Sequence, residues 1–331
     1  MADRRPTLAD VAHAAGVATS TVSRAFSRPQ RVNHRTRERV LAEAERLGYV
    51  PNPAAQALES GRTRTIALLV PDITNPYFSG VIKGAERGAA NAGLTLVLGD
   101  TAESSAAEAQ LVRRLERAVD GFVIAASRLT DDELRTAATR TPITLVNRAT
   151  AGMGCVVADY DSGTHQIVDH LASYGHRSFV FVGGPAESWS GARRWQGLQA
   201  AAAERGMEVR RSGPYLPTLS GGPAAADAVL ASGATAVVCH NDILAIGLMR
   251  RLAERGVSVP GEISVVGFDD VFGADFCHPT LTTLAERTED AGRRAVELLV
   301  TQVPLRQAGG PTRVLPTQLV VRGSTGPVTS M

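Results

Sequence analysis

The first fifty residues carry apolar side chains at the spacing of an α-helix. Leu8, Val11, Ala12 and Ala15 recur at i, i+3, i+4 and i+7 behind a Thr7 cap, and Gly16 interrupts the pattern. A second amphipathic stretch starts near Thr19, and a third runs from an Asn33 cap to Gly48. The pattern therefore predicts three short helices over residues 7–48, of which the first two form a helix-turn-helix.

The second of these helices begins with polar, short side chains. Thr19 and Ser20 open it, and Arg24 follows one turn after Ser20 on the same side. Hydroxyls donate to or accept from several bases, and Arg binds guanine in a bidentate manner, so this helix suits a major groove. The alternative is a plain three-helix bundle with a solvated polar face.

Residues 49–61 join this head to the rest of the chain and contain a short helix signal. Asn52 is a candidate cap, Pro53 suits the first helical position, and Gly61 is a stop. A helix over about 52–60 is only two turns long and is marginal in isolation. Its one large apolar residue, Leu58, either packs on a second copy of the helix or wedges between base pairs.

From Ile66 onward, short apolar runs alternate with amphipathic helical stretches. This alternation is typical of parallel α/β sheets, and eight strands over about 200 residues suit two sheets better than one. The expected strands are 66–70, 94–99, 121–125, 143–147, 156–158, 179–182, 236–239 and 264–268, with helices such as 80–92, 163–174 and 243–255 between them.

Polar and aromatic side chains gather just after several of these strands, where parallel sheets bind ligands. The runs are 71–78, 183–194, 240–242 and 269–270. A mixture of aromatic rings, Asn, Arg and Asp suits a polyhydroxylated or similarly polar small molecule held in a two-lobed clamp.

Charge is unevenly distributed, although the net charge is only +2. Residues 1–64 contain 11 Arg, no Lys and 6 acidic residues, whereas the remainder carries a small acidic excess. A basic head on a slightly acidic body indicates that the head meets a polyanion.

Several classes of protein are disfavoured. The three widely spaced cysteines, Cys155, Cys239 and Cys277, indicate neither a disulfide framework nor a zinc site, and they fit a reducing cytoplasm. No apolar run approaches the ~18 residues of a membrane span, and no secretory signal is visible. Phosphate-loop, dinucleotide and nucleophile-elbow motifs are missing, so we expect no enzyme, no cofactor and no metal.

The head is similar to the lactose-repressor (LacI) family of bacterial transcription regulators. The matching runs are 7–12 (Thr-Leu-Ala-Asp-Val-Ala), 15–24 (Ala-Gly-Val-Ala-Thr-Ser-Thr-Val-Ser-Arg), 35–37, 47–52 (Leu-Gly-Tyr-Val-Pro-Asn) and 57–58. The resemblance implies base-reading roles for Thr19, Ser20 and Arg24, and places Leu58 as the minor-groove lever. It implies DNA-backbone contacts for Thr7, Leu8, Asn33, Thr36, Tyr49 and Asn52.

The resemblance extends along nearly the whole chain and implies a body like the periplasmic sugar-binding proteins. The effector-pocket residues that it implies are Asp72, Asn75, Tyr77, Phe78, Arg194, Asn241, Asp269 and Glu286. Glu286 falls where the lactose repressor has Gln, which adds a negative charge to the pocket. Asn241 or Asp269 alone is also compatible with a helix cap.

We therefore predict an all-α helix-turn-helix DNA-binding head plus an α/β two-lobed, periplasmic-binding-protein-like effector domain. Residues 1–60 form the head with its hinge helix, and residues 62–331 form the effector-binding and dimerisation domain. The expected function is a cytoplasmic, homodimeric repressor that binds palindromic operator DNA and is switched by a small, sugar-like effector. The alternatives are a sugar-binding receptor without a regulatory role and an enzyme of sugar metabolism.

Overall fold

A computed structural model describes residues 6–27, 29–50, 61–305 and 309–328. The predicted hinge helix 52–60, with Asn52 and Leu58, lies outside the described residues. The chain divides into two compact units, Met1–Arg64 with Ala118–Asp120, and Thr65–Arg117 with Gly121–Met331. Within the described residues, no helix combines the length and the apolar character needed to cross a bilayer.

The head contains the predicted helix-turn-helix. Its elements are α1 (Leu8–Ala15), α2 (Thr19–Ser27), η1 (Pro29–Arg31) and α3 (His34–Leu47). Thr7 and Asp10 cap each other's backbone amides in a capping box, and Gly16 ends α1 in the left-handed region with φ 61°. Small apolar residues form the core between the helices, namely Val11, Ala12, Ala15, Val22, Ala25, Val40 and Ala44.

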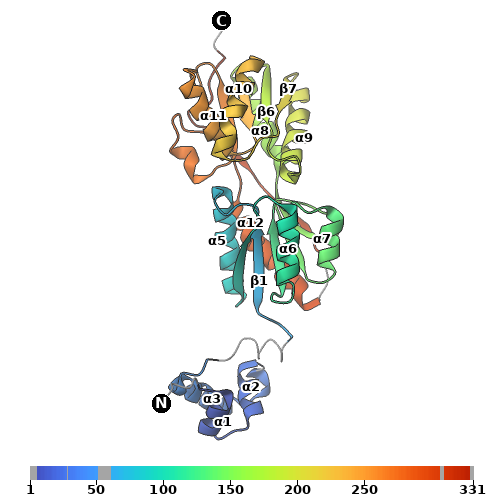
Figure 1. The fold of residues 1–331 in the computed structure, drawn as a ribbon, viewed down its shortest axis with the longest axis vertical. Helices are drawn as coiled ribbons and strands as arrows, with labels where there is room; N and C mark the ends of the chain where they lie inside the picture. The colour runs from blue at the N-terminus through green and yellow to red at the C-terminus, as the bar shows by residue number, and fades with distance from the viewer. Residues whose placement is uncertain (1–5, 28, 51–60, 306–308, 329–331) are drawn as a thin grey trace. The chain divides into compact units, whose positions relative to one another are not determined.

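The body contains two six-stranded sheets with helices on both faces (Figure 1). The first sheet has the order β11-β5-β4-β3-β1-β2, and the second has the order β12-β10-β9-β8-β6-β7. All neighbouring strands are parallel except β10 and β12, which are antiparallel. We call each sheet with its helices a lobe.

The strands of the first lobe are β1 (Thr65–Val70), β2 (Thr95–Asp100), β3 (Gly121–Ala125), β4 (Ile143–Val146), β5 (Gly154–Ala158) and β11 (Thr312–Leu315). Its helices are α5 (Pro76–Asn91), α6 (Ser105–Leu115), α7 (Asp131–Ala138) and α12 (Thr288–Gln302). The strands of the second lobe are β6 (Ser178–Val182), β7 (Glu208–Ser212), β8 (Ala236–Cys239), β9 (Ser264–Asp269), β10 (Thr282–Ala285) and β12 (Gln318–Val320). Its helices are α8 (Tyr160–Ser173), α9 (Trp189–Glu204), α10 (Gly222–Ser232) and α11 (Asp242–Glu254), with short 3-10 turns η2 (Leu219–Gly221) and η3 (Phe272–Asp275). A further 3-10 turn, η4 (Val303–Leu305), follows α12.

The eight predicted strands are confirmed to within two residues, but four further strands were not predicted. The edge strands β7 and β11 are largely exposed and carry polar side chains, so they lack an apolar signal. Strand β12 spans only three residues and β10 only four. These four strands are defined by their pairing with neighbours rather than by their own composition.

Three crossings between the lobes position the site. The chain passes between the sheets after β5, after β10, and between β11 and β12. Tyr160 begins the helix after the first crossing, and Glu286 lies in the second crossing, between β10 and α12. Both residues therefore lie where the two lobes meet.

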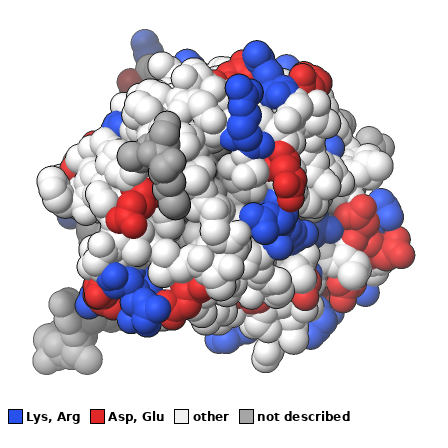
Figure 2. Space-filling view, turned by 90° about the horizontal axis from the view of Figure 1, so that it is seen from above, with Lys and Arg blue, Asp and Glu red and all other residues white. Residues whose placement is uncertain are grey.

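On the face shown in Figure 2, basic and acidic side chains are interspersed, and neither sign covers a broad area. A continuous basic patch is the usual footprint of nucleic-acid binding.

Candidate functional site

The exposed face of α2 presents the three predicted base-reading residues. Thr19, Ser20 and Arg24 are all exposed. Arg24 folds back along the helix, and its Nε and Nη2 donate to the carbonyl and hydroxyl oxygens of Ser20 at 2.9 and 3.1 Å. The head thus holds a guanidinium and hydroxyls together on one exposed helix face, which is the chemistry that reads base edges.

The remaining predicted head residues also hold the fold together. Asn33 caps α3 by accepting from the Arg35 amide, as Thr7 caps α1. Leu8 and Tyr49 pack on the head core, with the Tyr49 ring 5.9 Å from that of Phe26. Thr36 is half-buried on α3. Their contacts with DNA remain predictions.

The body contains a cavity between the two lobes, at the carboxyl ends of strands from both sheets. Its free volume is about 30 Å³. The lining comprises Asn75, Tyr77, Phe78, Glu103, Ala126, Arg128 and Asn147 from the first lobe, and Ser188, Ser190, Arg194, Pro217, His240, Asn241 and Asp269 from the second. This is the place at which α/β sheets bind small molecules.

Backbone strain is concentrated at this cavity. Four of its lining residues, Glu103, Ala126, Asn147 and Asp269, are non-glycine residues with φ values of 57°, 45°, 55° and 109°. Such conformations cost of order 1–3 kcal/mol each and cluster at functional sites. These strained residues make the cavity a candidate binding site independently of its polarity.

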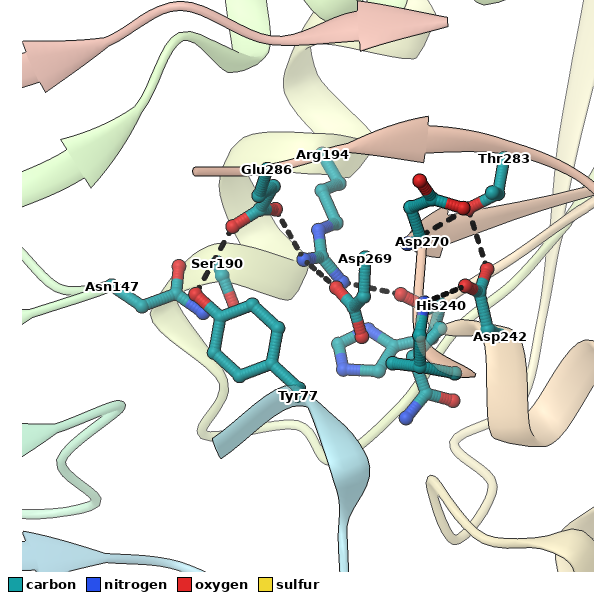
Figure 3. Close-up of polar contacts among 12 residues, drawn as sticks. Tyr77, Asn147, Ser190, Arg194, His240, Asp242, Asp269, Asp270, Thr283 and Glu286 are labelled. Atoms are coloured by element: carbon teal, nitrogen blue, oxygen red, sulfur yellow. Dashed lines mark hydrogen bonds and ion pairs between the residues drawn. The ribbon is translucent and has the colours of Figure 1, made fainter. Parts of the chain in front are cut away.

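A fully buried arginine organises the second-lobe side of the cavity (Figure 3). Arg194 Nη2 lies 2.8 Å from both Asp269 Oδ1 and Glu286 Oε1. Its Nη1 donates to the carbonyl oxygen of His240. The guanidinium carbon lies 4.5 Å from the centre of the Phe268 ring and 5.1 Å from that of Tyr160. One cation thus meets two carboxylates in a site closed by aromatic faces.

Two hydrogen-bonded chains connect Arg194 to the first lobe. Tyr77, at the start of α5, donates to Glu286 Oε2 at 3.0 Å. The hydroxyl of Tyr160 lies 3.3 Å from Arg194 Nη2 and donates to Asn147 Oδ1 at 2.6 Å. The Arg194 cluster is therefore hydrogen-bonded to residues of both lobes.

Burial shifts the pKa values of two side chains that line the cavity, Asp269 and His240. It raises the pKa of Asp269 well above its ordinary value; the Glu286 charge adds to this effect, and Arg194 opposes it. Burial, with help from Arg194, lowers the pKa of His240 well below its usual value, so this imidazole is neutral. The described residues contain no cluster of three or more His, Cys, Asp or Glu suited to a metal ion.

Six of the eight predicted pocket residues line this cavity: Asn75, Tyr77, Phe78, Arg194, Asn241 and Asp269. Asn241 also caps α11, so the helix-cap alternative describes part of its role, and Asn75 caps α5. Glu286 contacts Arg194 and lines a smaller neighbouring cavity. Asp72 lies outside the lining, because its carboxylate accepts from the amide and hydroxyl of Thr74 in a local turn.

Six polar lining residues were not predicted as site residues: Glu103, Arg128, Asn147, Ser188, Ser190 and His240. Glu103, Arg128 and Asn147 follow β2, β3 and β4, so a search of every strand end would have found them. Ser188 and Ser190 lie at the start of α9, within the polar run that was noted after β6.

Known proteins match both parts of the chain. A model of bacterial regulatory proteins of the lacI family matches residues 7–52, and a model of the periplasmic binding protein-like domain matches residues 168–325. The HTH-type transcriptional repressor CytR of Escherichia coli strain K12 is 32% identical over 329 residues, which is 96% of each chain.

Solved structures of regulators share the whole fold. The lac repressor dimer bound to operator and the anti-inducer ONPF has a TM-score of 0.85 and 27% identity, covering 98% of this chain and 100% of its own. The complex of the transcriptional regulator CelR with cellobiose has a TM-score of 0.72 and 30% identity, covering 97% and 100%. These proteins are transcriptional regulators and not enzymes. The chain therefore belongs to the lacI family of bacterial regulatory proteins, as a DNA-binding transcriptional repressor.

Proposed function

We propose that a small polar effector, bound in the cavity between the lobes, controls the affinity of this repressor for its operator. The observation that carries the proposal is the buried Arg194 cluster, which lines the cavity and is linked to both lobes. An effector that contacts this cluster favours one arrangement of the lobes over another. Such differential affinity is the only means by which a ligand shifts a conformational equilibrium.

The lining favours a sugar-like frame for the effector. Tyr77 and Phe78 offer aromatic faces, and Ser188, Ser190 and Asn147 offer hydroxyl and amide groups. Rings cover the C–H face of a sugar and polar groups bind its hydroxyls. The related regulator CelR was solved with the sugar cellobiose.

The functional unit that we propose is a homodimer on a near-palindromic operator. Phe272 and Phe276 on the second lobe are 81% and 73% exposed, and their ring centres are 4.7 Å apart. A paired aromatic surface of this kind favours burial against a second copy. A two-fold dimer presents two recognition helices to two half-sites, which requires a near-palindrome.

Selection of DNA from a random-sequence pool by the full chain tests the proposal. We expect a near-palindromic site, and we expect its dissociation constant in fluorescence anisotropy to change when a sugar or related metabolite binds. Asp269→Asn should weaken the ligand response while operator binding persists. A receptor without a regulatory role would select no DNA sequence, and a ligand that binds in calorimetry without changing operator affinity would refute effector control.

A further inference from the structure

The charges around the cavity do not balance. Two arginines and two acidic residues belong to the described lining. Arg128 is paired with Glu103, whose carboxylate lies 2.6 Å from Nη2. Arg194 is shared between Asp269, which lines the cavity, and Glu286, which lies directly behind the guanidinium. With both carboxylates ionised, the Arg194 cluster would carry one net negative charge, and burial together with Glu286 raises the pKa of Asp269, so that a proton on this carboxyl relieves the excess.

The excess charge is deeply buried. The side chains of Arg194, Asp269 and Glu286 are 2%, 5% and 4% exposed, so solvent screens them poorly. Both carboxylates contact the same guanidinium nitrogen, which brings two like charges close together in a site of low polarity. Such an arrangement is stable only with a further positive charge or a shared proton.

The other described cations whose charge reaches His240 are Arg128 and Arg211. Arg128 is paired with Glu103 and Arg211 lies over the Trp195 ring, so neither is an ion-pair partner of Asp269 or Glu286. His240, beside Arg194, is neutral because burial lowers its pKa. Asp242, whose charge also acts on Asp269, is fully buried with a pKa raised to about 7, and it supplies no positive charge. Glu286 Oε2 is occupied by the Tyr77 hydroxyl, whereas the Arg194 bond to Asp269 ends on Oδ1. Asp269 is therefore the carboxylate presented to the cavity.

We propose that the effector carries a positively charged nitrogen that binds at Asp269 and completes the Arg194 cluster. Apart from the Glu103–Arg128 ion pair, the neutral His240 and two apolar residues, the remaining lining is hydroxyl, amide and aromatic. The ligand class is therefore a protonated amine on a polar frame, as in an amino sugar. Tyr77 and Phe78 place aromatic rings at the same cavity, and such faces also attract cations. This inference rests on the proposed function, because it specifies the ligand of the same cavity.

Glu286 makes the charge requirement testable with an isosteric change. In Glu286→Gln the amide oxygen still accepts from Arg194, and the amide nitrogen donates to the Tyr77 hydroxyl, which turns to accept. The hydrogen bonds are kept while Arg194 and Asp269 become a neutral pair. The variant therefore separates the need for charge from the need for structure.

The experiment compares amines with their neutral counterparts by thermal shift and calorimetry at pH 7. The probes are D-glucosamine, D-galactosamine and D-mannosamine, each beside the parent sugar and its N-acetyl derivative. We expect at least one amine to bind the wild-type chain about tenfold or more tightly than both neutral partners. In Glu286→Gln this preference should fall by a similar factor.

The inference is overturned if neutral compounds bind the wild type as well as the amines, if none of the amines binds, or if Glu286→Gln keeps the full preference for an amine. Operator affinity, measured with the same compounds, separates the two proposals. A neutral sugar that binds and changes operator affinity overturns the charge inference and leaves effector control intact. An amine that binds with the expected preference and leaves operator affinity unchanged supports the charge inference and refutes effector control.

Discussion

Replacing Arg194 with leucine tests whether the guanidinium is the counter-charge of the cavity. Leucine keeps an apolar body between the Tyr160 and Phe268 rings but removes the charge. Asp269 and Glu286 then lose their ion-pair partner within the protein interior. The structure thus predicts an effect on folding stability in addition to the loss of effector response.

The expected cost follows from burial. Removing one partner of a buried ion pair leaves an uncompensated charge and costs about 3–5 kcal/mol. The adjacent Arg193 provides a matched control on the same helix, because its side chain is 40% exposed and its partner Asp161 is 72% exposed. Exposed pairs contribute about 0–1 kcal/mol, so Arg193→Leu should change the free energy of unfolding little.

Urea unfolding followed by tryptophan fluorescence is a direct assay. The chain has two tryptophans, and both lie on α9, the helix that carries Arg194. The ring of Trp195 stacks 5.9 Å from that of Phe181 in the second lobe, so its emission reports on this packing. We expect Arg194→Leu to lower the free energy of unfolding by several times the loss seen in Arg193→Leu.

The loss should shrink as the pH falls. Arg194 lowers the pKa of Asp269, so in Arg194→Leu this carboxyl takes up a proton at a higher pH than in the wild type, and the unpaired charge disappears. Adding Asp269→Asn and Glu286→Gln to Arg194→Leu should restore stability at pH 7 for the same reason. If Arg194→Leu is within about 1 kcal/mol of the wild type at pH 7, Arg194 is not the counter-charge and the reasoning is refuted.

Three further predictions concern other parts of the chain. Arg24→Ala should weaken operator binding by about 1–3 kcal/mol and relax one base preference per half-site; an equal loss on random DNA in gel-shift assays would make Arg24 a phosphate contact. Burial raises the pKa of Asp242 to about 7, so the folded state keeps a proton that the unfolded chain releases above about pH 4, and stability falls as the pH rises through this window. In Asp242→Asn the side-chain amide donates to Thr283 and no longer titrates, so the loss of stability with rising pH should be smaller by up to about 1.4 kcal/mol per pH unit. Urea unfolding from pH 4 to 7 measures this slope, and an unchanged slope would contradict the raised pKa of Asp242. In Gly84→Ala the added methyl overlaps the carbonyl of Glu289 where α5 crosses α12, so thermal unfolding should show a loss of about 1–3 kcal/mol, and an unchanged midpoint would mean that the helices separate freely.

Local patterns in the sequence were enough to locate most elements of the fold. The caps at Thr7 and Asn33 and the glycine stops at Gly16 and Gly48 act within one helical turn, so neighbouring residues reveal them. The inner strands are buried on both faces, and they read as continuous apolar runs. The exposed edge strands β7 and β11 were missed because their strand conformation depends on a neighbour rather than on their own residues.

The candidate site was also predictable only in part from the sequence. Strand ends indicated where polar residues would meet, and six of eight predicted pocket residues line the cavity. Which charges pair there depended on the folding of distant segments. Tyr77 and Glu286 are 209 positions apart, and Arg194 is 92 positions from Glu286. Asp72 was predicted to line the pocket, but its carboxylate accepts a hydrogen bond from the hydroxyl of the nearby Thr74. Ion pairing and burial depend on distances in space, and the crossings between the two lobes set those distances.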